Sequence, residues 1–308
     1  MEHCTWPGYT LSRIALGTVQ LGLPYGIANR SGQPDFRESR EIVKTAWERG
    51  INCFDTAQSY GESEQILGKA LRSLGITEKA LVITKLGLNL QGKPAEEIFL
   101  SIQHSREVLG VPRLFGVLLH RGSWLKAWGI YGPALKRLKK EGIASFVGVS
   151  IYTEEEIEQA FSLPEIDLIQ APFNVFDQRA VSLKWFEKAR LAGKLIVIRS
   201  VFLQGLLVMP LSDLSRQMEF ARKPLERYQL LCKRSGTSLA TMALGYVAAR
   251  SSGAVMLLGA ETAAQIKENC AMLEVSETRA EEIEALFGNI DRKISNPALW
   301  PVERKDTK

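Results

Sequence analysis

The sequence lacks several patterns that would place it in other structural classes. No Gly-x-Gly-x-x-Gly turn occurs, which argues against an open, doubly wound dinucleotide-binding sheet. Gly17 and Gly22 have the separation of a phosphate-binding P-loop, but Leu23 stands where the lysine belongs. No proline-, glycine- or serine-rich linker interrupts the 308 residues, so a single domain over residues 1–308 is expected.

The chain is also poor in cysteine, in long apolar runs and in charge of one sign. Its four cysteines are far apart, so we expect free thiols in a reducing compartment and no metal site. No signal peptide or membrane-spanning run is visible, which predicts a cytoplasmic protein. The net charge is only +5, and the basic cluster around Lys139 lacks aromatic neighbours, so we expect no nucleic-acid partner.

Short, apolar and often β-branched runs recur along the chain, and segments of helical spacing follow them. Near-continuous apolar character is what strands buried on both faces require. The predicted strands are Ile14–Gln20, Asn52–Ala57, Leu81–Leu86, Leu114–His120, Phe146–Tyr152, Leu168–Asn174, Leu195–Phe202 and Ala254–Ala260. The predicted helices between them include Arg37–Arg49, Ala95–Leu109, Ala180–Ala192 and a helix from a capping box at Thr153 to Phe161.

Eight alternating units predict an α/β fold, a closed (β/α)8 TIM barrel with its active site at the carboxyl edge of the strands. Long connections at residues 22–34 and 203–224 are interpreted as lids, and for the first a flexible connection is an equal alternative. A C-terminal extension, from about residue 275 to 308, is expected to pack near the barrel mouth.

Four strand ends or adjoining loops carry titratable groups of complementary kinds. Asp55 ends the second predicted strand, Tyr60 lies in the loop beyond it, Lys85 lies in the third strand and His120 ends the fourth. Each alone has a structural explanation, as a helix cap or a satisfied core residue. A lysine inside an apolar strand, however, is seldom buried without a partner. Together they predict a catalytic cluster at the barrel mouth.

With these residues in place, the chain resembles the aldo-keto reductase superfamily over nearly its whole length. The motifs that carry the resemblance are Leu16-Gly17-Thr18, Phe54-Asp55-Thr56-Ala57 with Tyr60-Gly61 and Ser63-Glu64, Ile83-Thr84-Lys85, Leu118-Leu119-His120, Gly148-Val149-Ser150, Ile169-Gln170 with Phe173-Asn174, Gln204-Gly205-Leu206-Leu207, and Gly259-Ala260 with Glu268-Asn269. The resemblance implies an Asp55–Tyr60–Lys85–His120 tetrad and hydride transfer from NAD(P)H to a carbonyl. Tyr60 would be the general acid, its pKa lowered by Lys85, and His120 would donate a hydrogen bond to the carbonyl oxygen.

The same resemblance implies where the dinucleotide would lie. Ser150 and Gln170 would hold the carboxamide of the nicotinamide, and Asn269 would face the adenine. The other residues expected along the cofactor are Gly17, Thr18, Leu203, Gln204, Gly205 and Gly259.

Two positions near the nicotinamide depart from the family pattern. Arg199 stands where an aromatic residue usually lies under the ring, and Ile151 stands where an asparagine is common. A guanidinium can stack on a ring, but its charge would weaken binding of the oxidised cofactor. Arg199 therefore either stacks while paired to an acid, binds an anionic substrate group, or points away from the site.

A third departure follows the eighth strand. Glu261 and Gln265 occupy positions where relatives that prefer NADPH carry lysine, arginine or serine. A carboxylate repels a 2′-phosphate and can accept a hydrogen bond from a ribose hydroxyl. We predict that NADH is accepted at least as well as NADPH, although the family pattern favours NADPH.

The expected partner is a small carbonyl substrate, an aldehyde, ketone or sugar, whose identity the sequence does not specify. Candidate pocket walls are Tyr25, Asn29, Trp124 and Trp300. The alternatives are a sugar or alcohol dehydrogenase and a cofactor-binding regulatory barrel without turnover. A monomer or a weak homo-oligomer is expected.

Overall fold

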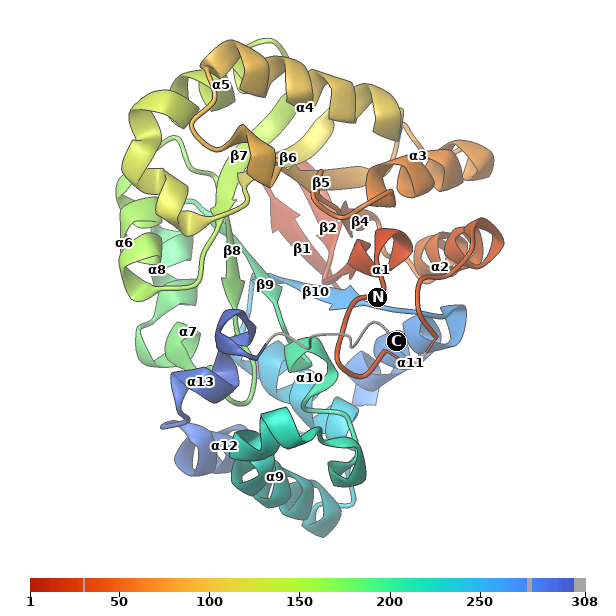
Figure 1. Cartoon of the computed structure of the whole chain (residues 1–308), viewed down its shortest axis with the longest axis vertical. Coiled ribbons are helices and arrows are strands. Elements are labelled where there is room, and N and C mark those ends of the chain that lie inside the picture. The colour runs from red at the N-terminus through yellow and green to blue at the C-terminus, as the bar shows by residue number, and fades with distance from the viewer. Residues whose placement is uncertain (30, 276–278, 302–308) are drawn as a thin grey trace.

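Eight parallel strands close into a barrel in the computed structural model, which describes residues 1–29, 31–275 and 279–301. In the order in which they pair, the strands are β10 (Val255–Gly259), β3 (Ile14–Gly17), β4 (Cys53–Asp55), β5 (Leu81–Lys85), β6 (Leu114–Leu119), β7 (Ala144–Ser150), β8 (Leu168–Pro172) and β9 (Leu195–Arg199), and β9 pairs with β10 to close the ring. Each corresponds to a strand predicted from the sequence. The TIM-barrel fold is therefore confirmed (Figure 1).

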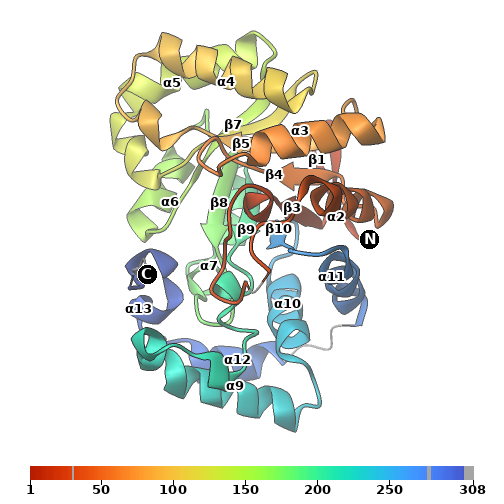
Figure 2. The same cartoon turned by 45° about the vertical axis from the view of Figure 1, so that its right-hand side comes forward.

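Helices surround the barrel, as Figures 1 and 2 show. They are α1 (Val19–Gly22), α2 (Phe36–Glu48), α3 (Ser63–Leu74), α4 (Ala95–Leu109), α5 (Trp128–Lys140), α6 (Glu154–Ser162), α7 (Arg179–Ser182), α8 (Trp185–Leu191), α9 (Arg222–Arg234), α10 (Leu239–Arg250), α11 (Ala263–Val275), α12 (Ala280–Phe287) and α13 (Arg292–Ser295). Among the described residues, no helix combines the length and the apolar character of a membrane span.

Two helix predictions have different outcomes. The capping box at Thr153 is present, because its side chain accepts from the backbone N–H of Glu156 and the Glu156 carboxylate accepts from Thr153 in return. The single helix predicted at Ala180–Ala192 is wrong. Lys184 adopts a left-handed conformation with φ of 55°, which a continuous α-helix cannot contain, and this divides the segment into α7 and α8.

A hairpin that the sequence analysis did not predict closes the amino-terminal end of the barrel. Its strands β1 (His3–Trp6) and β2 (Tyr9–Ser12) pair antiparallel. Cys4 and Leu11 are buried in one apolar cluster with inward-facing strand residues such as Val197. A separate cluster fills the layer between strands and helices. The hairpin thus fills one end of the barrel and leaves the carboxyl edge open.

The two long connections meet beside the carboxyl edge. Ile27, in the connection after β3, donates its backbone N–H to the carbonyl of Gln204, in the turn after β9 (3.1 Å). Gly205 has φ of 97°, and a Cβ at this position would lie 2.4 Å from the Cβ of Ala28. The two loops therefore pack directly against each other at the open end of the barrel.

The described part of the C-terminal extension reaches the same edge. After α13 comes a 3-10 turn, η6 (Pro297–Leu299). Arg292 donates to the carbonyl of Tyr152, beyond β7 (3.5 Å), and Ala298 lines the cleft described below. Residues 276–278 and 302–308 of the predicted extension lie outside the described residues.

We expect Leu11→Ala to lower the free energy of unfolding by about 2–5 kcal/mol, because it leaves a cavity between the N-terminal hairpin and the barrel strands. Leu11 is fully buried, whereas Leu191 on α8 is 71% exposed. Leu191→Ala is the matched control and should change stability by less than about 0.5 kcal/mol. Urea denaturation followed by circular dichroism measures both variants, and equal losses would contradict a structural role for the hairpin.

Candidate active site

The carboxyl edge of the barrel brings four titratable side chains together. Asp55 and Lys85 are the last residues of β4 and β5, and His120 directly follows β6. Tyr60 lies in the turn between β4 and α3. Because β5 pairs with both β4 and β6 in parallel, the three strand ends lie side by side.

A buried ion pair lies at the centre of this cluster. Lys85 and Asp55 are each 1% exposed, and the ammonium of Lys85 donates to Oδ1 of Asp55. The same ammonium donates to the carbonyl of Thr56 (2.9 Å), and Gln170 donates to Oδ2 of Asp55 (2.8 Å). Both charges are therefore hydrogen-bonded from more than one side, which a pair removed from water requires.

Tyr60 and His120 pack against this pair. Nζ of Lys85 lies 4.9 Å from the centre of the Tyr60 ring, and the rings of Tyr60 and His120 meet edge to face with centroids 5.8 Å apart. All four side chains line one cleft. A phenol beside an ammonium and an imidazole is suited to proton transfer with an oxygen bound in that cleft.

Burial and charge together set the protonation states of the cluster. Burial disfavours the charged form of Lys85, but Asp55 and Tyr60 outweigh it, and the pKa of Lys85 is raised. Burial, with a contribution from Lys85, lowers the pKa of His120 to about 4, so the imidazole is neutral at pH 7. Burial raises the pKa of Tyr60, and Lys85 opposes this only in part. The sequence-based expectation of an acidified phenol is therefore wrong, because the effect of burial on the pKa of Tyr60 outweighs that of the Lys85 ammonium.

A second buried polar network lies next to the tetrad, and its role was not predicted from the sequence. The carboxyl group of Glu64 on α3 accepts hydrogen bonds from Thr84 on β5 (2.6 Å) and Ser105 on α4 (3.1 Å). Its neighbour Ser63 shares a hydrogen bond with Thr18 at the end of β3 (2.8 Å). These contacts tie α3 to β5, to α4 and to the end of β3. The Ser63-Glu64 pair in the sequence motif was the feature from which this network could have been predicted.

A cleft of about 780 Å³ extends from the tetrad across the strand ends. Besides the tetrad, the predicted residues that line it are Gly17, Thr18, Tyr25, Asn29, Ser150, Gln170, Arg199, Gln204, Gly205, Gly259, Glu261, Gln265 and Asn269. Among the residues that the structure describes, no group of three or more histidine, cysteine, aspartate or glutamate side chains is arranged to hold a metal ion.

Three predicted contacts need correction, because Leu203, Trp124 and Trp300 do not line the cleft. Leu203 is fully buried in the apolar core. Trp124 is also buried, where its ring stacks on Tyr131 with centroids 5.1 Å apart. Trp300 turns its indole nitrogen to the carbonyl of Ile294 (3.1 Å) within the C-terminal segment. In each case packing in the core or within the tail takes the side chain away from the cleft.

One wall of the cleft suits the phosphates and amide of a dinucleotide. Ser200, Leu203 and Gln204 have φ of 62°, 49° and 55°, values that non-glycine residues seldom adopt and that concentrate at functional sites. Oε1 of Gln20 is buried without a hydrogen-bond partner among the described residues. The Gln20 side chain also lies where a Cβ on Gly259 would be, at 2.4 Å. The unpaired oxygen of Gln20 and the absence of a side chain at Gly259 are both consistent with a polar ligand that binds here.

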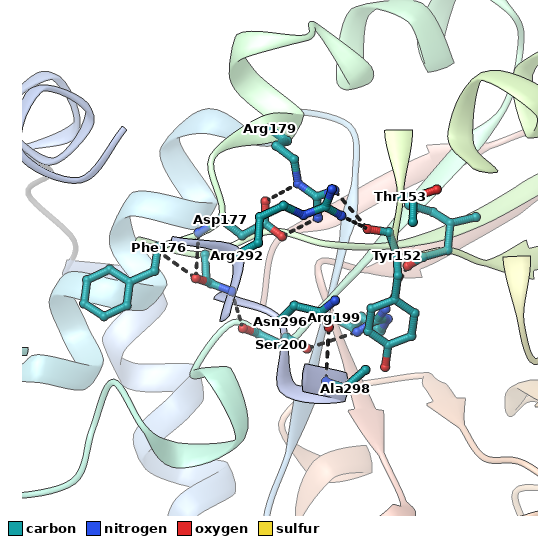
Figure 3. Close-up of polar contacts among 12 residues, drawn as sticks. Tyr152, Thr153, Phe176, Asp177, Arg179, Arg199, Ser200, Arg292, Asn296 and Ala298 are labelled. Atoms are coloured by element: carbon teal, nitrogen blue, oxygen red, sulfur yellow. Dashed lines mark hydrogen bonds and ion pairs between the residues drawn. The ribbon is translucent and has the colours of Figure 1, made fainter. Parts of the chain in front are cut away.

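Arg199 lines the cleft and stacks on Tyr152, which was not among the predicted site residues. Its guanidinium carbon lies 3.9 Å from the centre of the Tyr152 ring. Nη2 donates to the carbonyl of Ile151 (2.7 Å) and Nη1 to the hydroxyl of Ser200 (3.3 Å) (Figure 3). No carboxylate in the described part of the chain pairs with it, so neutralisation by an acid is not its role.

Comparison with known proteins agrees with this geometry. The family model described as "Aldo/keto reductase family" matches residues 13–288. The chain belongs to the aldo/keto reductase family. It is 28% identical over 305 residues to the NADH-specific methylglyoxal reductase of Escherichia coli (strain K12), covering 87% of this chain and 91% of that protein. It is 26% identical over 296 residues to the L-galactose dehydrogenase of Arabidopsis thaliana, covering 91% and 89%.

A solved structure of this family shares the fold. The aldo-keto reductase AKR11C1 from Bacillus halodurans (holo form) superposes with a TM-score of 0.74 at 23% identity, covering 97% of this chain and 98% of that one. As an aldo/keto reductase, the protein is an oxidoreductase of the NAD(P)H-dependent carbonyl class.

We expect Gly22→Ala to displace the turn that carries Tyr60. A Cβ on Gly22 would lie 1.9 Å from the carbonyl oxygen of Tyr60 and 2.6 Å from the backbone nitrogen of Ser63. Turnover of a small aldehyde should fall by about a hundredfold, the loss typical of a misplaced catalytic group. Gly129→Ala is the control, because its Cβ would meet nothing within 4 Å. Unchanged kcat in a folded Gly22→Ala protein would show that the turn tolerates displacement.

Proposed function

We propose that this enzyme reduces a small aldehyde, ketone or sugar to an alcohol, with Tyr60 as the general acid. The supporting observation is the Tyr60 phenol next to the buried Lys85–Asp55 pair, on the wall of the cleft. The negative charge that develops on the carbonyl oxygen requires a proton and hydrogen-bond donors. Tyr60 supplies the proton, and the neutral imidazole of His120 donates a hydrogen bond.

The dinucleotide supplies the hydride, and residues at the tetrad end of the cleft are suited to hold its carboxamide. The side-chain amide nitrogen of Gln170 donates to Oδ2 of Asp55 (2.8 Å). This orientation leaves the side-chain carbonyl oxygen of Gln170 to accept a hydrogen bond. Ser150 is paired with Gln170 in the register of β7 and β8 and lines the same cleft. This pair offers the proposed contacts although Ile151 replaces the common asparagine.

The protonation state of Tyr60 favours reduction over alcohol oxidation. Reduction needs a neutral phenol that gives its proton to a strongly basic oxygen, whereas oxidation needs a phenolate that accepts one. Burial raises the pKa of Tyr60, so the phenol is the resting form at neutral pH. We therefore propose a reductase rather than a dehydrogenase. The complete tetrad argues against a regulatory barrel without turnover.

Tyr60→Phe should lower kcat for methylglyoxal by about 10²- to 10⁴-fold at pH 7, because it removes the general acid. In the unaltered enzyme the rate should stay constant from roughly pH 6 to 9 and fall as the pH rises further, since the active phenol has a raised pKa and loses its proton only there. His120, with a pKa of about 4, should add no transition near neutrality.

Cofactor absorbance at saturating substrate measures these rates. Tyr9→Phe is the matched control, because Tyr9 lies in the hairpin at the other end of the barrel, where its hydroxyl contacts Ser145 (2.6 Å). Near-normal turnover by Tyr60→Phe would remove Tyr60 from the proposed role. A rate that rose steadily toward high pH would point instead to a phenolate and to alcohol oxidation.

We further propose that NADH is accepted at least as well as NADPH. The carboxylate of Glu261 lines the cleft and accepts a hydrogen bond from Ser31 (3.3 Å). Gln265 is tied to the main chain, since its Oε1 accepts from the backbone N–H of Glu261 (2.6 Å). A carboxylate at this point disfavours a 2′-phosphate. The relative named as an NADH-specific methylglyoxal reductase supports the same preference.

Glu261→Gln should shift the ratio of the two dissociation constants toward NADPH by about tenfold, because it removes one like-charge repulsion. Quenching of tryptophan fluorescence by each dinucleotide measures both constants without turnover. Glu187→Gln removes the same charge from an exposed position on α8, outside the cleft, and should leave the ratio unchanged. An unaltered enzyme that binds NADPH clearly more tightly than NADH would refute the preference.

For the cellular setting, we propose a cytoplasmic enzyme that acts on a small molecule as a monomer or weak homo-oligomer. Cys4, Cys53 and Cys232 are buried thiols without disulfide partners. Unbridged thiols are usual in a reducing compartment. Sedimentation analysis and cell fractionation test these two statements.

A further inference from the structure

The tetrad end of the cleft carries positive charge on two arginines. Glu156 also lines the cleft, but its Oε2 accepts from the backbone N–H groups of Tyr152 (2.7 Å) and Thr153 (3.1 Å). The carboxylate of the tetrad, Asp55, is already paired with Lys85. Arg121 and Arg199 line the same cleft, and both lower the pKa of His120, so their charges act at the tetrad. Neither has a carboxylate partner among the residues that the structure describes. An anionic ligand would therefore be stabilised here.

Arg199 is held in one orientation while part of its guanidinium remains unused. Its plane stacks on Tyr152 at 3.9 Å, and Nη2 is fixed by the carbonyl of Ile151 (2.7 Å). Nε is buried and has no hydrogen-bond partner within residues 1–29, 31–275 and 279–301. A guanidinium edge with free N–H groups matches the two oxygens of a carboxylate or phosphate. Nη1 and Nη2 each carry two N–H bonds and use one of them within the protein, so each keeps one for an anion.

The backbone of Tyr152, on which Arg199 stacks, is held by two further arginines (Figure 3). The carbonyl of Tyr152 accepts from Nη1 of Arg179 (2.9 Å), and Asp177 holds Arg179 through two hydrogen bonds (2.8 and 2.7 Å). Arg292 of the C-terminal segment makes a longer contact with the same carbonyl (3.5 Å). These contacts fix the backbone of Tyr152, whose ring stacks on the guanidinium.

The backbone next to Arg199 is also fixed by buried contacts. Ser200 has a left-handed φ of 62°, and its carbonyl accepts from the amide of Asn174 (3.1 Å). Asn174 is fully buried, and its Oδ1 accepts from the backbone N–H groups of Phe176 (2.8 Å) and Asp177 (3.0 Å). Such strain persists only where surrounding contacts impose it, and it is common at ligand sites. The structure therefore maintains a strained turn immediately beyond Arg199.

We propose that Arg199 binds an anionic group of the substrate, so that the preferred substrates are carbonyl compounds carrying a carboxylate or a phosphate. This inference rests on the proposed carbonyl reduction and specifies its substrate class. Arg199 and Tyr60 line one cleft, so the proposed substrate would have its carbonyl at Tyr60 and its anionic group at Arg199. The competing role, contact with the nicotinamide, requires the guanidinium to act on cofactor affinity, which can be measured separately.

The test compares substrates that differ in charge but little in shape. The pairs are 4-carboxybenzaldehyde with its methyl ester, and glyceraldehyde 3-phosphate with glyceraldehyde. Arg199→Gln should lower kcat/KM for the charged member by about 10- to 100-fold, the effect expected for losing a hydrogen bond to a charged group, and should change the neutral member by less than about threefold. The pair that responds identifies carboxylate or phosphate as the recognised group.

Arg190→Gln is the matched control, because it removes the same charge from an exposed side chain of α8, outside the cleft. It should change the charged-to-neutral ratio by less than about threefold. The dissociation constant of NADH, measured without substrate, should be equal in Arg199→Gln and the unaltered enzyme. Equal losses for charged and neutral substrates, equal effects of the two variants, or weakened NADH binding would each overturn the proposal.

A binding measurement separates this inference from the proposed function. Benzoate and inorganic phosphate need no turnover, and one of them should raise the melting temperature of the unaltered protein but not that of Arg199→Gln. If no carbonyl compound is reduced while this shift is seen, the proposed reduction fails and the anion site stands. If neutral aldehydes are reduced and neither anion shifts the melting temperature, the anion site fails and the reduction stands.

Discussion

The buried ion pair between Lys85 and Asp55 is the interaction on which the rest of the site depends. Each charge is almost completely removed from water, and neither is stable there without the other. The pair also needs Gln170, which comes from β8 and donates to Asp55. Strands from separate parts of the ring must therefore be in place before the pair is satisfied. Closure of the barrel and assembly of the buried cluster are in this sense one event.

Much of this arrangement was predictable because it follows from local rules. Strands buried on both faces must be apolar, so eight apolar runs were visible in the sequence, and their alternation with helices fixed the fold class. Asp55, Lys85 and His120 were conspicuous because polar side chains at the ends of such strands are costly unless they are used. The barrel topology then guaranteed that these ends meet at one edge.

What escaped prediction depends on contacts between distant residues. The strands of the N-terminal hairpin are only four residues long and mix buried with exposed positions, so they have no clear periodicity. A tryptophan such as Trp124 is a common residue type in pocket walls. Its stacking on Tyr131 arises only in the folded protein and cannot be read from the sequence. The raised pKa of Tyr60 has the same origin, since desolvation depends on everything that surrounds the ring. The pairing of Arg199 with Tyr152 joins two strand ends and has no local signal.

The two ends of the cleft carry opposite charge, and one loop contacts both. At one end Ser31 donates to the carboxylate of Glu261, whose negative charge is the basis of the proposed preference for NADH. At the other, burial raises the pKa of Tyr25 to about 12 and the charge of Arg199 partly opposes this, so the same loop also lies near the guanidinium. Between them Ile27 is hydrogen-bonded to Gln204, on the wall that suits a dinucleotide. The connection after β3 therefore lies along the cleft between Glu261 and Arg199 and lines it at both ends.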